Sequence, residues 1–228
     1  SVATAYLISR NNWLMGQYIR MENRFLVNLN EKHMQDLGKV KATAGWFDEQ
    51  LYLVAYKLEP GSPLAEKQLK DLRFGEEYGC DIVYTTCSHD INFMPNGKDE
   101  IHQGATIMLI GMESNHKAFA NAIKQRDLKV TIAHSPQTLR DYMLDDTVPR
   151  DQQLFTFSVP VDEKSELLNK SIRSTNIRSN WQCMIVGLEH GNFPLPMPDI
   201  DQLFEKGDLL WILGRPSHLQ RLIMEEKL

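Results

Sequence analysis

An internal repeat constrains this chain more than any other feature of its sequence. When the 228-residue sequence is compared with itself at an offset of 103 residues, without a gap, identical residues align from position 62 to position 114. They include Ser62 with Ser165, Cys80 with Cys183, Ile82-Val83 with Ile185-Val186, Pro95 with Pro198, Gly104 with Gly207 and Gly111 with Gly214. A repeat of this length predicts two copies of one small domain. A chain of 228 residues is long enough for both.

The same order of secondary-structure signals occurs in each copy. Segments rich in strand formers, 51–58 and 155–159, are each followed by a serine and a helical spacing of leucines, so we expect helices that begin at Ser62 and Ser165. Further strands are expected at 80–84 and 183–187, and at 106–110 and 209–213. Trailing helices are expected from Ser114 and Ser217. The unit is therefore β-α-β-β-β with a trailing helix, and the fold class is α+β.

Two segments lie outside the repeat. Residues 4–35 carry apolar side chains at helical spacing, which predicts an amphipathic helix; these are Leu14, Tyr18, Met21, Phe25 and Leu29. Between the copies, Ser135-Pro136 predicts the start of a short helix that runs through Leu139 and Tyr142. Residues 145–150 are typical of a linker, so the domain boundary is expected there.

Charge and cysteine content exclude several classes of protein. Twenty-five Lys and Arg against thirty Asp and Glu give a net charge of −5, so the broad positive surface that binds nucleic acid is missing. The longest apolar run, 107–112, is far shorter than the roughly 20 residues of a membrane-spanning helix. Three cysteines without a CxxC pair indicate a reducing, cytosolic compartment and provide no zinc site. Histidines His89 and His102 match no metal-ligand spacing, so no metal is expected.

Several stretches resemble the C-terminal domain of regulators of potassium conductance, the family called RCK-C or TrkA-C. In the first copy the resemblance lies in Ser62-Pro63-Leu64-Ala65-Glu66-Lys67-Gln68-Leu69-Lys70-Asp71-Leu72, Tyr78–Val83 and Ile101–Gly104. In the second copy it is strongest in Phe204-Glu205-Lys206-Gly207-Asp208-Leu209-Leu210-Trp211-Ile212-Leu213-Gly214. The resemblance implies two tandem TrkA-C-like domains without a catalytic function. No GxGxxG fingerprint is present, so binding of NAD or ATP by a Rossmann-type lobe is not implied and no cofactor is expected.

The stretch from Arg20 to Glu31 is similar to the segment that joins the last membrane helix to the cytosolic tail of bacterial cation:proton antiporters. This resemblance implies the regulatory tail of a monovalent cation (potassium or sodium):proton antiporter, at the cytoplasmic face of the bacterial inner membrane. The expected domains are a helical linker from the membrane domain (1–35), the first TrkA-C-like domain (36–124), a helix and linker (125–150), and the second TrkA-C-like domain (151–228). The attached membrane domain would then precede this chain, which starts at a serine instead of a methionine.

The family resemblance also implies a ligand groove and a homodimer. Some relatives bind cyclic di-AMP between paired C-domains, and the corresponding groove here would be lined by Arg73, Tyr78 and Asp81, with His89 nearby. An arginine beside an aromatic ring can bind a phosphate and stack a base. Asp81 is unfavourable for an anionic ligand unless it accepts a hydrogen bond from the base.

Two other functions remain open from the residues alone. The chain could be a ligand-sensing module for a soluble partner, such as a transcription regulator, with the 4–35 helix as the contact. It could also be a small α+β enzyme, although no carboxylate pair, triad, nucleophile elbow or glycine-rich phosphate loop is present in the sequence. The matched cysteines Cys80 and Cys183 are flanked by apolar residues, which is typical of buried structural thiols.

Overall fold

The computed structural model describes residues 46–88, 90–149, 152–191 and 193–226. The amphipathic helix expected at 4–35 lies outside the described residues, as does the antiporter-like stretch 20–31. No helix among the described residues is long and apolar enough to cross a membrane.

The first copy is built on a five-stranded antiparallel sheet in the order β4-β3-β6-β1-β7. Its strands are β1 (Leu51–Leu58), β3 (Asp81–Cys87), β4 (Asp90–Phe93), β6 (Thr106–Met112) and β7 (Val130–Thr138). β1 and β6 are buried over almost their whole length, because both faces of the sheet are covered. A short antiparallel pair, β2 (Lys67–Gln68) with β5 (Glu100–Ile101), lies beside this sheet.

Four helices accompany these strands: α3 (Trp46–Gln50), α4 (Leu69–Leu72), α5 (Phe74–Tyr78) and α6 (Glu113–Gln125). The helix expected from Ser62 is wrong in its start, since residues 62–66 form turns and residues 67–68 form β2. The Ser62 hydroxyl accepts a hydrogen bond from the Leu64 amide at 3.3 Å and donates one to the Leu128 carbonyl at 2.6 Å. Ser62 therefore closes a turn against a distant loop instead of capping a helix.

The second copy contains a four-stranded antiparallel sheet in the order β10-β9-β11-β8. Its strands are β8 (Phe155–Pro160), β9 (Cys183–His190), β10 (Phe193–Pro196) and β11 (Leu209–Gly214). Its helices are α8 (Ile172–Thr175), α9 (Ile177–Trp181) and α10 (Pro216–Glu226). The helix expected from Ser165 is also wrong in its start, because α8 begins at Ile172 behind the cap of Ser171.

The 103-residue repeat extends to the backbone conformation. Six pairs of equivalent residues share a positive φ angle, a conformation that costs energy at most residue types. These pairs are Glu66/Asn169, Arg73/Asn176, Gly79/Gln182, Ser88/Gly191, Met94/Met197 and Gly104/Gly207. The sheet registers shift at Val83 in the first copy and at Val186 in the second, and each carbonyl there accepts a hydrogen bond from the equivalent methionine amide. The two copies are therefore the same fold.

The strand β7 was not expected from the sequence. It pairs with β1 in a register interrupted at two places, and α7 (Leu139–Leu144) follows it directly. The helix predicted to start at Ser135-Pro136 therefore starts later, at Leu139, where the Thr138 hydroxyl caps it by accepting from the Asp141 amide. β7 is irregular and mostly exposed, so its sequence lacks the apolar alternation that marks a strand.

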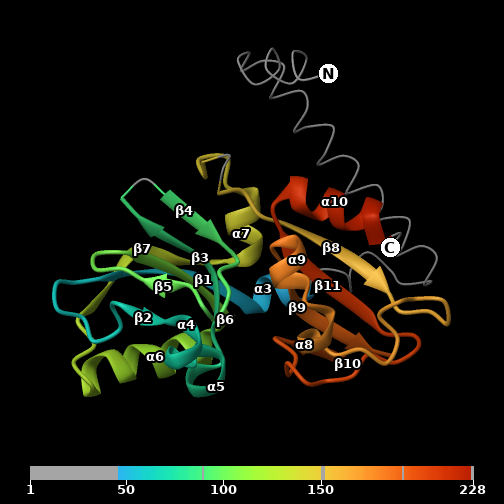
Figure 1. Ribbon diagram of the computed structural model, residues 1–228, viewed down its shortest axis with the longest axis horizontal. Coiled ribbons are helices and arrows are strands. Elements are labelled where there is room, and N and C mark those ends of the chain that lie inside the picture. The colour runs from blue at the N-terminus through green and yellow to red at the C-terminus, as the bar shows by residue number, and fades with distance from the viewer. Residues whose placement is uncertain (1–45, 89, 150–151, 192, 227–228) are drawn as a thin grey trace, which may run out of the picture.

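The copies lie side by side and share a core (Figure 1). One face of each sheet packs on the helices of its own copy, in clusters around Phe119 and Phe204. The opposite faces meet in one common cluster, to which equivalent positions of the two copies contribute. These equivalent members are Leu51/Leu154, Val83/Val186, Met108/Trp211 and Ile110/Leu213. The predicted α+β class is confirmed, its sheets are antiparallel, and the two copies share one of the three hydrophobic clusters.

Candidate functional site

The structure gives Arg73, Tyr78 and Asp81 three different partners. Arg73 lies between α4 and α5 with φ 46°, where it ends one short helix and starts the next. Its Nε donates to the Glu76 carboxylate at 2.7 Å, and both side chains are exposed. This contact with Glu76 raises the pKa of Arg73.

Tyr78 lies at the end of α5 and faces a different set of groups. Its hydroxyl accepts a hydrogen bond from Arg126 at 3.1 Å, and Arg126 also pairs with Glu77 at 2.8 Å. The Tyr78 ring packs against Phe119 with the ring centroids 5.0 Å apart. Burial, followed by the neighbouring Glu77, raises the pKa of the Tyr78 hydroxyl. His89 lies outside the described residues.

Asp81, the first residue of β3, lies at the contact between the copies. Its carboxylate is 2.7 Å from the guanidinium of Arg178 in α9, and it also accepts a hydrogen bond from the Ile82 amide at 2.9 Å. Arg178 donates as well to the carbonyl oxygens of Ile82 at 3.3 Å and Pro95 at 3.2 Å. We call these four residues the copy interface. The positive charge of Arg178 thus balances the negative charge of the Asp81 carboxylate at this position.

A second cationic contact joins the copies. The guanidinium carbon of Arg215, directly before α10, lies 5.0 Å from the centre of the Phe93 ring at the end of β4. Arginine over an aromatic face is attracted by the negative charge of the ring's π-system. The copies are therefore held by a shared apolar cluster and by two arginines of the second copy that reach the first.

Each copy also contains a small cavity, and the two cavities are equivalent. The cavity of the second copy has a volume of about 290 Å³, and that of the first copy about 170 Å³. Eight pairs of equivalent residues line both, namely 63/166, 64/167, 67/170, 71/174, 72/175, 74/177, 77/180 and 78/181. Typical small-molecule sites begin at roughly 300 Å³, so only the second-copy cavity approaches the size that a small ligand needs.

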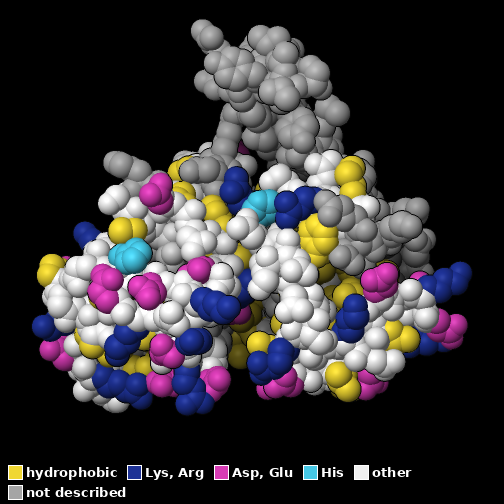
Figure 2. Space-filling view, in the orientation of Figure 1, with side chains coloured by type: hydrophobic (Ala, Val, Ile, Leu, Met, Phe, Trp, Pro, Cys, Tyr) yellow, Lys and Arg dark blue, Asp and Glu magenta, His cyan; other side chains and the backbone are white. Residues whose placement is uncertain are grey.

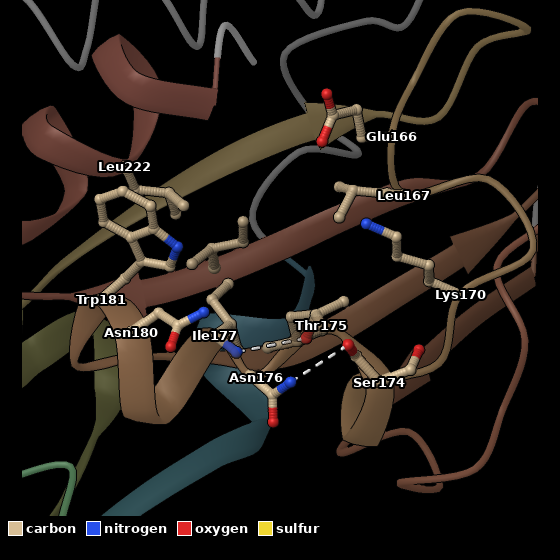
Figure 3. Close-up of a pocket in the computed structure, with 12 residues that line it drawn as sticks. Glu166, Leu167, Lys170, Ser174, Thr175, Asn176, Ile177, Asn180, Trp181 and Leu222 are labelled. Carbon is tan, nitrogen blue, oxygen red and sulfur yellow. Dashed lines mark hydrogen bonds between the residues drawn. The ribbon is translucent and has the colours of Figure 1, made fainter.

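The second-copy cavity combines an apolar floor with a polar rim (Figure 3). Ile177, Ile185, Ile212 and Leu222 form the floor, and all four are buried. The Trp181 ring stands at one side and the Lys170 side chain at the other. Arg221 lies outside this wall, 5.3 Å from the centre of the Trp181 ring, and donates to the Asn180 carbonyl at 3.1 Å.

The described residues contain no group of three side chains that could hold a metal ion. The thiols of Cys80 and Cys183 are fully buried, and burial raises the pKa of each to about 12. A thiol with such a pKa is protonated at neutral pH and is a poor nucleophile. The two matched cysteines are therefore packing residues of the repeat.

Comparison with known proteins finds a family match in the second copy. The family model of the TrkA-C domain matches residues 156–225. The match begins in β8 and ends in α10, so it covers the whole second copy. No curated protein matches the chain.

Solved structures of three proteins are similar to parts of the chain. An RCK_C domain dimer of BusR from S. agalactiae, in complex with c-di-AMP, is 26% identical over 32% of this chain and 95% of its own, with a TM-score of 0.29. The RCK domain of GsuK is 12% identical over 77% of this chain and 63% of its own, with a TM-score of 0.33. The RCK C domain of the potassium transport protein KtrA, in complex with c-di-AMP, is 21% identical over 31% of this chain and 81% of its own, with a TM-score of 0.28.

Sequence reasoning missed Arg178, which makes an ion pair and two hydrogen bonds to the first copy. Arg178 lies in α9, at the position equivalent to Gly75, so the repeat gave no reason to expect an arginine function there. It also missed both cavities, because their walls combine α4 with the segment after α6, or α8 with the distant strands β9 and β11. The sequence did indicate that the two copies differ here, because Glu77 and Asp71 of the first copy are acidic. Their equivalents in the second copy, Asn180 and Ser174, are neutral.

Proposed function

We propose that this chain is the non-catalytic regulatory region of a monovalent cation:proton antiporter, located on the cytoplasmic side of the bacterial inner membrane. The observation that carries the proposal is the TrkA-C domain at 156–225 together with the backbone equivalence of the first copy. A second support is the similarity of residues 20–31 to the segment that joins antiporter membrane helices to their tails. The proposed attached membrane domain would precede this chain.

The copies provide a physical route for regulation. Regulation requires two arrangements of the module and a ligand that binds one of them better. The equivalent faces of the two copies cover each other, in the manner of a two-fold dimer within one chain. We propose that the two arrangements differ at the copy interface, where a single arginine makes the polar contacts with Asp81, Ile82 and Pro95.

The proposed ligand is cyclic di-AMP or another nucleotide. The BusR and KtrA domains named above are complexes with c-di-AMP, and the groove implied by the family resemblance includes Arg73, Tyr78 and Asp81. Asp81 is already paired with Arg178, so a nucleotide that takes this position must exchange contacts with that arginine. Ligand binding would then act directly on the contact between the copies.

The proposed homodimer must use other surfaces. The cluster that joins the two sheets is filled by side chains of the same chain, including Trp211 and Leu213, which are at most 4% exposed. A second chain therefore has to contact residues outside this cluster.

The proposed domain limits, 36–124, 125–150 and 151–228, need revision in one respect, because β7 at 130–138 belongs to the first sheet.

The coding sequence upstream of Ser1 tests the antiporter assignment. About a dozen hydrophobic segments each long enough to span a membrane would support it. A start codon directly before Ser1 would contradict it and favour the alternative, a ligand-sensing module for a soluble partner such as a transcription regulator. We expect no direct contact of this chain with nucleic acid, because the net charge is −5 and both signs of charge are mixed over the face in Figure 2.

Calorimetric titration with cyclic di-AMP tests the ligand. The proposal predicts saturable heat with the wild-type chain and weaker binding with Arg73→Ala, which removes the arginine expected to bind a phosphate. Arg173→Ala is the matched control, since Arg173 pairs with Asp201 on the exposed surface. No heat and no thermal shift at millimolar cyclic di-AMP or adenine nucleotides would leave a structural role only for the Asp81 position.

A further inference from the structure

The second-copy cavity carries two opposite charges at its rim. Among the residues that line it, Glu166 and Lys170 are the two charged ones. Both are exposed at the rim, and within the described part of the chain neither forms an ion pair. A rim with one unpaired cation and one unpaired anion leaves both charges available to a ligand.

The first-copy cavity differs in its internal contacts and in its size. Its lining includes Glu77, Tyr78 and Arg126, and the Arg126 guanidinium donates to both the Glu77 carboxylate and the Tyr78 hydroxyl. Pro63 stands where the second copy has Glu166, and this rim also carries the exposed charges of Lys67 and Asp71. These contacts accompany the smaller volume of about 170 Å³.

The floor and wall of the second-copy cavity are suited to an apolar group. Ile177 and Ile185 are each 5% exposed, and Ile212 is fully buried. The half-buried Trp181 ring forms one wall, opposite Lys170 (Figure 3). Removal of CH₂ groups from water against such a surface is favourable, so the floor is suited to a small hydrophobic body.

We propose that this cavity binds a small zwitterion with an apolar body, the chemical pattern of an α-amino acid with a large hydrophobic side chain. The ligand carboxylate pairs with Lys170, its ammonium group pairs with Glu166, and its side chain lies on the isoleucine floor beside Trp181. A simple anion is attracted by Lys170 but repelled by Glu166. A simple cation is attracted by Glu166 but repelled by Lys170. Only a ligand with both charges satisfies both rim groups.

This site differs in size and place from the nucleotide groove proposed above. The cavity volume of about 290 Å³ suits a single ring with its polar group, whereas a cyclic dinucleotide has two bases and two phosphates. The cavity is lined by the second copy alone, and none of its lining residues is Asp81 or Arg178. The two proposals can therefore fail independently.

The test is calorimetric titration of the whole chain with three probes. L-Phenylalanine carries both charges, 3-phenylpropanoate lacks the ammonium group and phenethylamine lacks the carboxylate. We expect L-phenylalanine to bind saturably and each analogue to bind about tenfold more weakly, because each loses one charge-assisted contact. No saturable binding of L-phenylalanine at millimolar concentration, or equal binding of all three probes, would overturn the proposal.

Two variants assign the charges and one serves as control. Lys170→Met is expected to weaken L-phenylalanine about tenfold and to strengthen phenethylamine, which Lys170 repels, while Glu166→Gln weakens L-phenylalanine and strengthens 3-phenylpropanoate, which Glu166 repels. Lys67→Met changes the equivalent lysine of the first copy and should have no effect on any probe. An equal effect of Lys67→Met and Lys170→Met would place binding elsewhere and overturn the assignment. Circular dichroism confirms that each variant is folded, and cyclic di-AMP titration of the same samples keeps this result separate from the nucleotide proposal.

Discussion

The carboxylate of Asp81 in the first copy lies 2.7 Å from the guanidinium of Arg178 in the second copy. The same arginine donates to the carbonyl oxygens of Ile82 and Pro95. One side chain thus makes three polar contacts across the boundary between the two copies of the repeat. The equivalent position in the first copy is Gly75, so the contact is not repeated by symmetry. The interface between the copies is therefore pseudo-symmetric in its apolar cluster and asymmetric in its polar contacts.

Replacement of Arg178 by alanine should weaken the contact between the copies. The variant removes one partly buried ion pair and two hydrogen bonds from a charged donor, so we expect the free energy of unfolding to fall by about 2–3 kcal/mol. Urea denaturation measures this change. Arg173→Ala, which breaks the exposed pair with Asp201, should cost less than about 1 kcal/mol. Equal effects of the two variants would mean that Arg178 is an ordinary surface residue.

Truncation of the shared apolar cluster should cost more than loss of a surface leucine. Leu213 in β11 is fully buried in the cluster that joins the two sheets, so Leu213→Ala is expected to lower stability by about 2–5 kcal/mol. Leu203 is 54% exposed, and Leu203→Ala should stay within about 0.5 kcal/mol of the wild type. Thermal and urea unfolding of both variants provide the comparison. A small effect at Leu213 would show that the two sheets do not pack as described.

Stability should depend on pH through His190. The hydrogen bond from the His190 ring to the nearly fully buried Asp208 carboxylate, at 2.7 Å, raises the pKa of His190, and the charges of Asp208 and Glu205 add to the effect. A histidine whose folded pKa is raised stabilises the fold fully below its ordinary pKa of 6.5. That contribution is lost as the pH rises through the folded-state pKa.

His190→Asn is the variant that isolates this effect. The melting temperature of the wild type should fall as the pH rises above about 6.5, and the fall should be smaller in the variant. Nuclear magnetic resonance titration of the His190 ring should give a pKa above the ordinary value. A ring pKa at or below that value would mean that the contact with Asp208 does not form in solution.

The cysteines should differ sharply in reactivity. Cys80 and Cys183 are fully buried with pKa values of about 12, whereas Cys87 at the end of β3 is partly exposed. Because the thiolate is the reacting species, a maleimide should label Cys87 first in the native protein. Labelling of Cys80 and Cys183 should require unfolding. Mass spectrometry of peptides from the labelled protein distinguishes the three sites, and early labelling of Cys80 would contradict its placement in the core.

The repeat made most of the fold predictable. Strands such as β1 and β11 were expected because their runs of buried residues are continuous, and the trailing helices were expected from their amphipathic spacing. The segment after Ser62 was not predictable, because its leucines have helical spacing but Leu64 packs from a turn, while Leu69 and Leu72 pack from the short helix α4 beyond β2. β7 was missed because it is an edge strand that pairs with β1 among the described strands. Its own polar sequence does not reveal this pairing.

The site was less predictable than the fold. Arg73, Tyr78 and Asp81 are near one another in the sequence, but their side chains point to Glu76, Arg126 and Arg178. The residue that pairs with Asp81 is almost one hundred positions away, so no local pattern indicates it. Ligand binding at these residues stays a prediction. Only the packing of the two copies reveals that Asp81, and not Arg73 or Tyr78, pairs with the other copy.

Cation-driven proton exchange by membrane vesicles tests the central claim most directly. The vesicles would carry the complete protein that contains this chain, as wild type, as Arg178→Ala and as the control Arg173→Ala. If the two copies regulate transport through their mutual contact, Arg178→Ala changes the exchange rate or its response to cyclic di-AMP, and Arg173→Ala behaves as wild type. The same rate and the same response in all three proteins, or no exchange in any, would contradict the account.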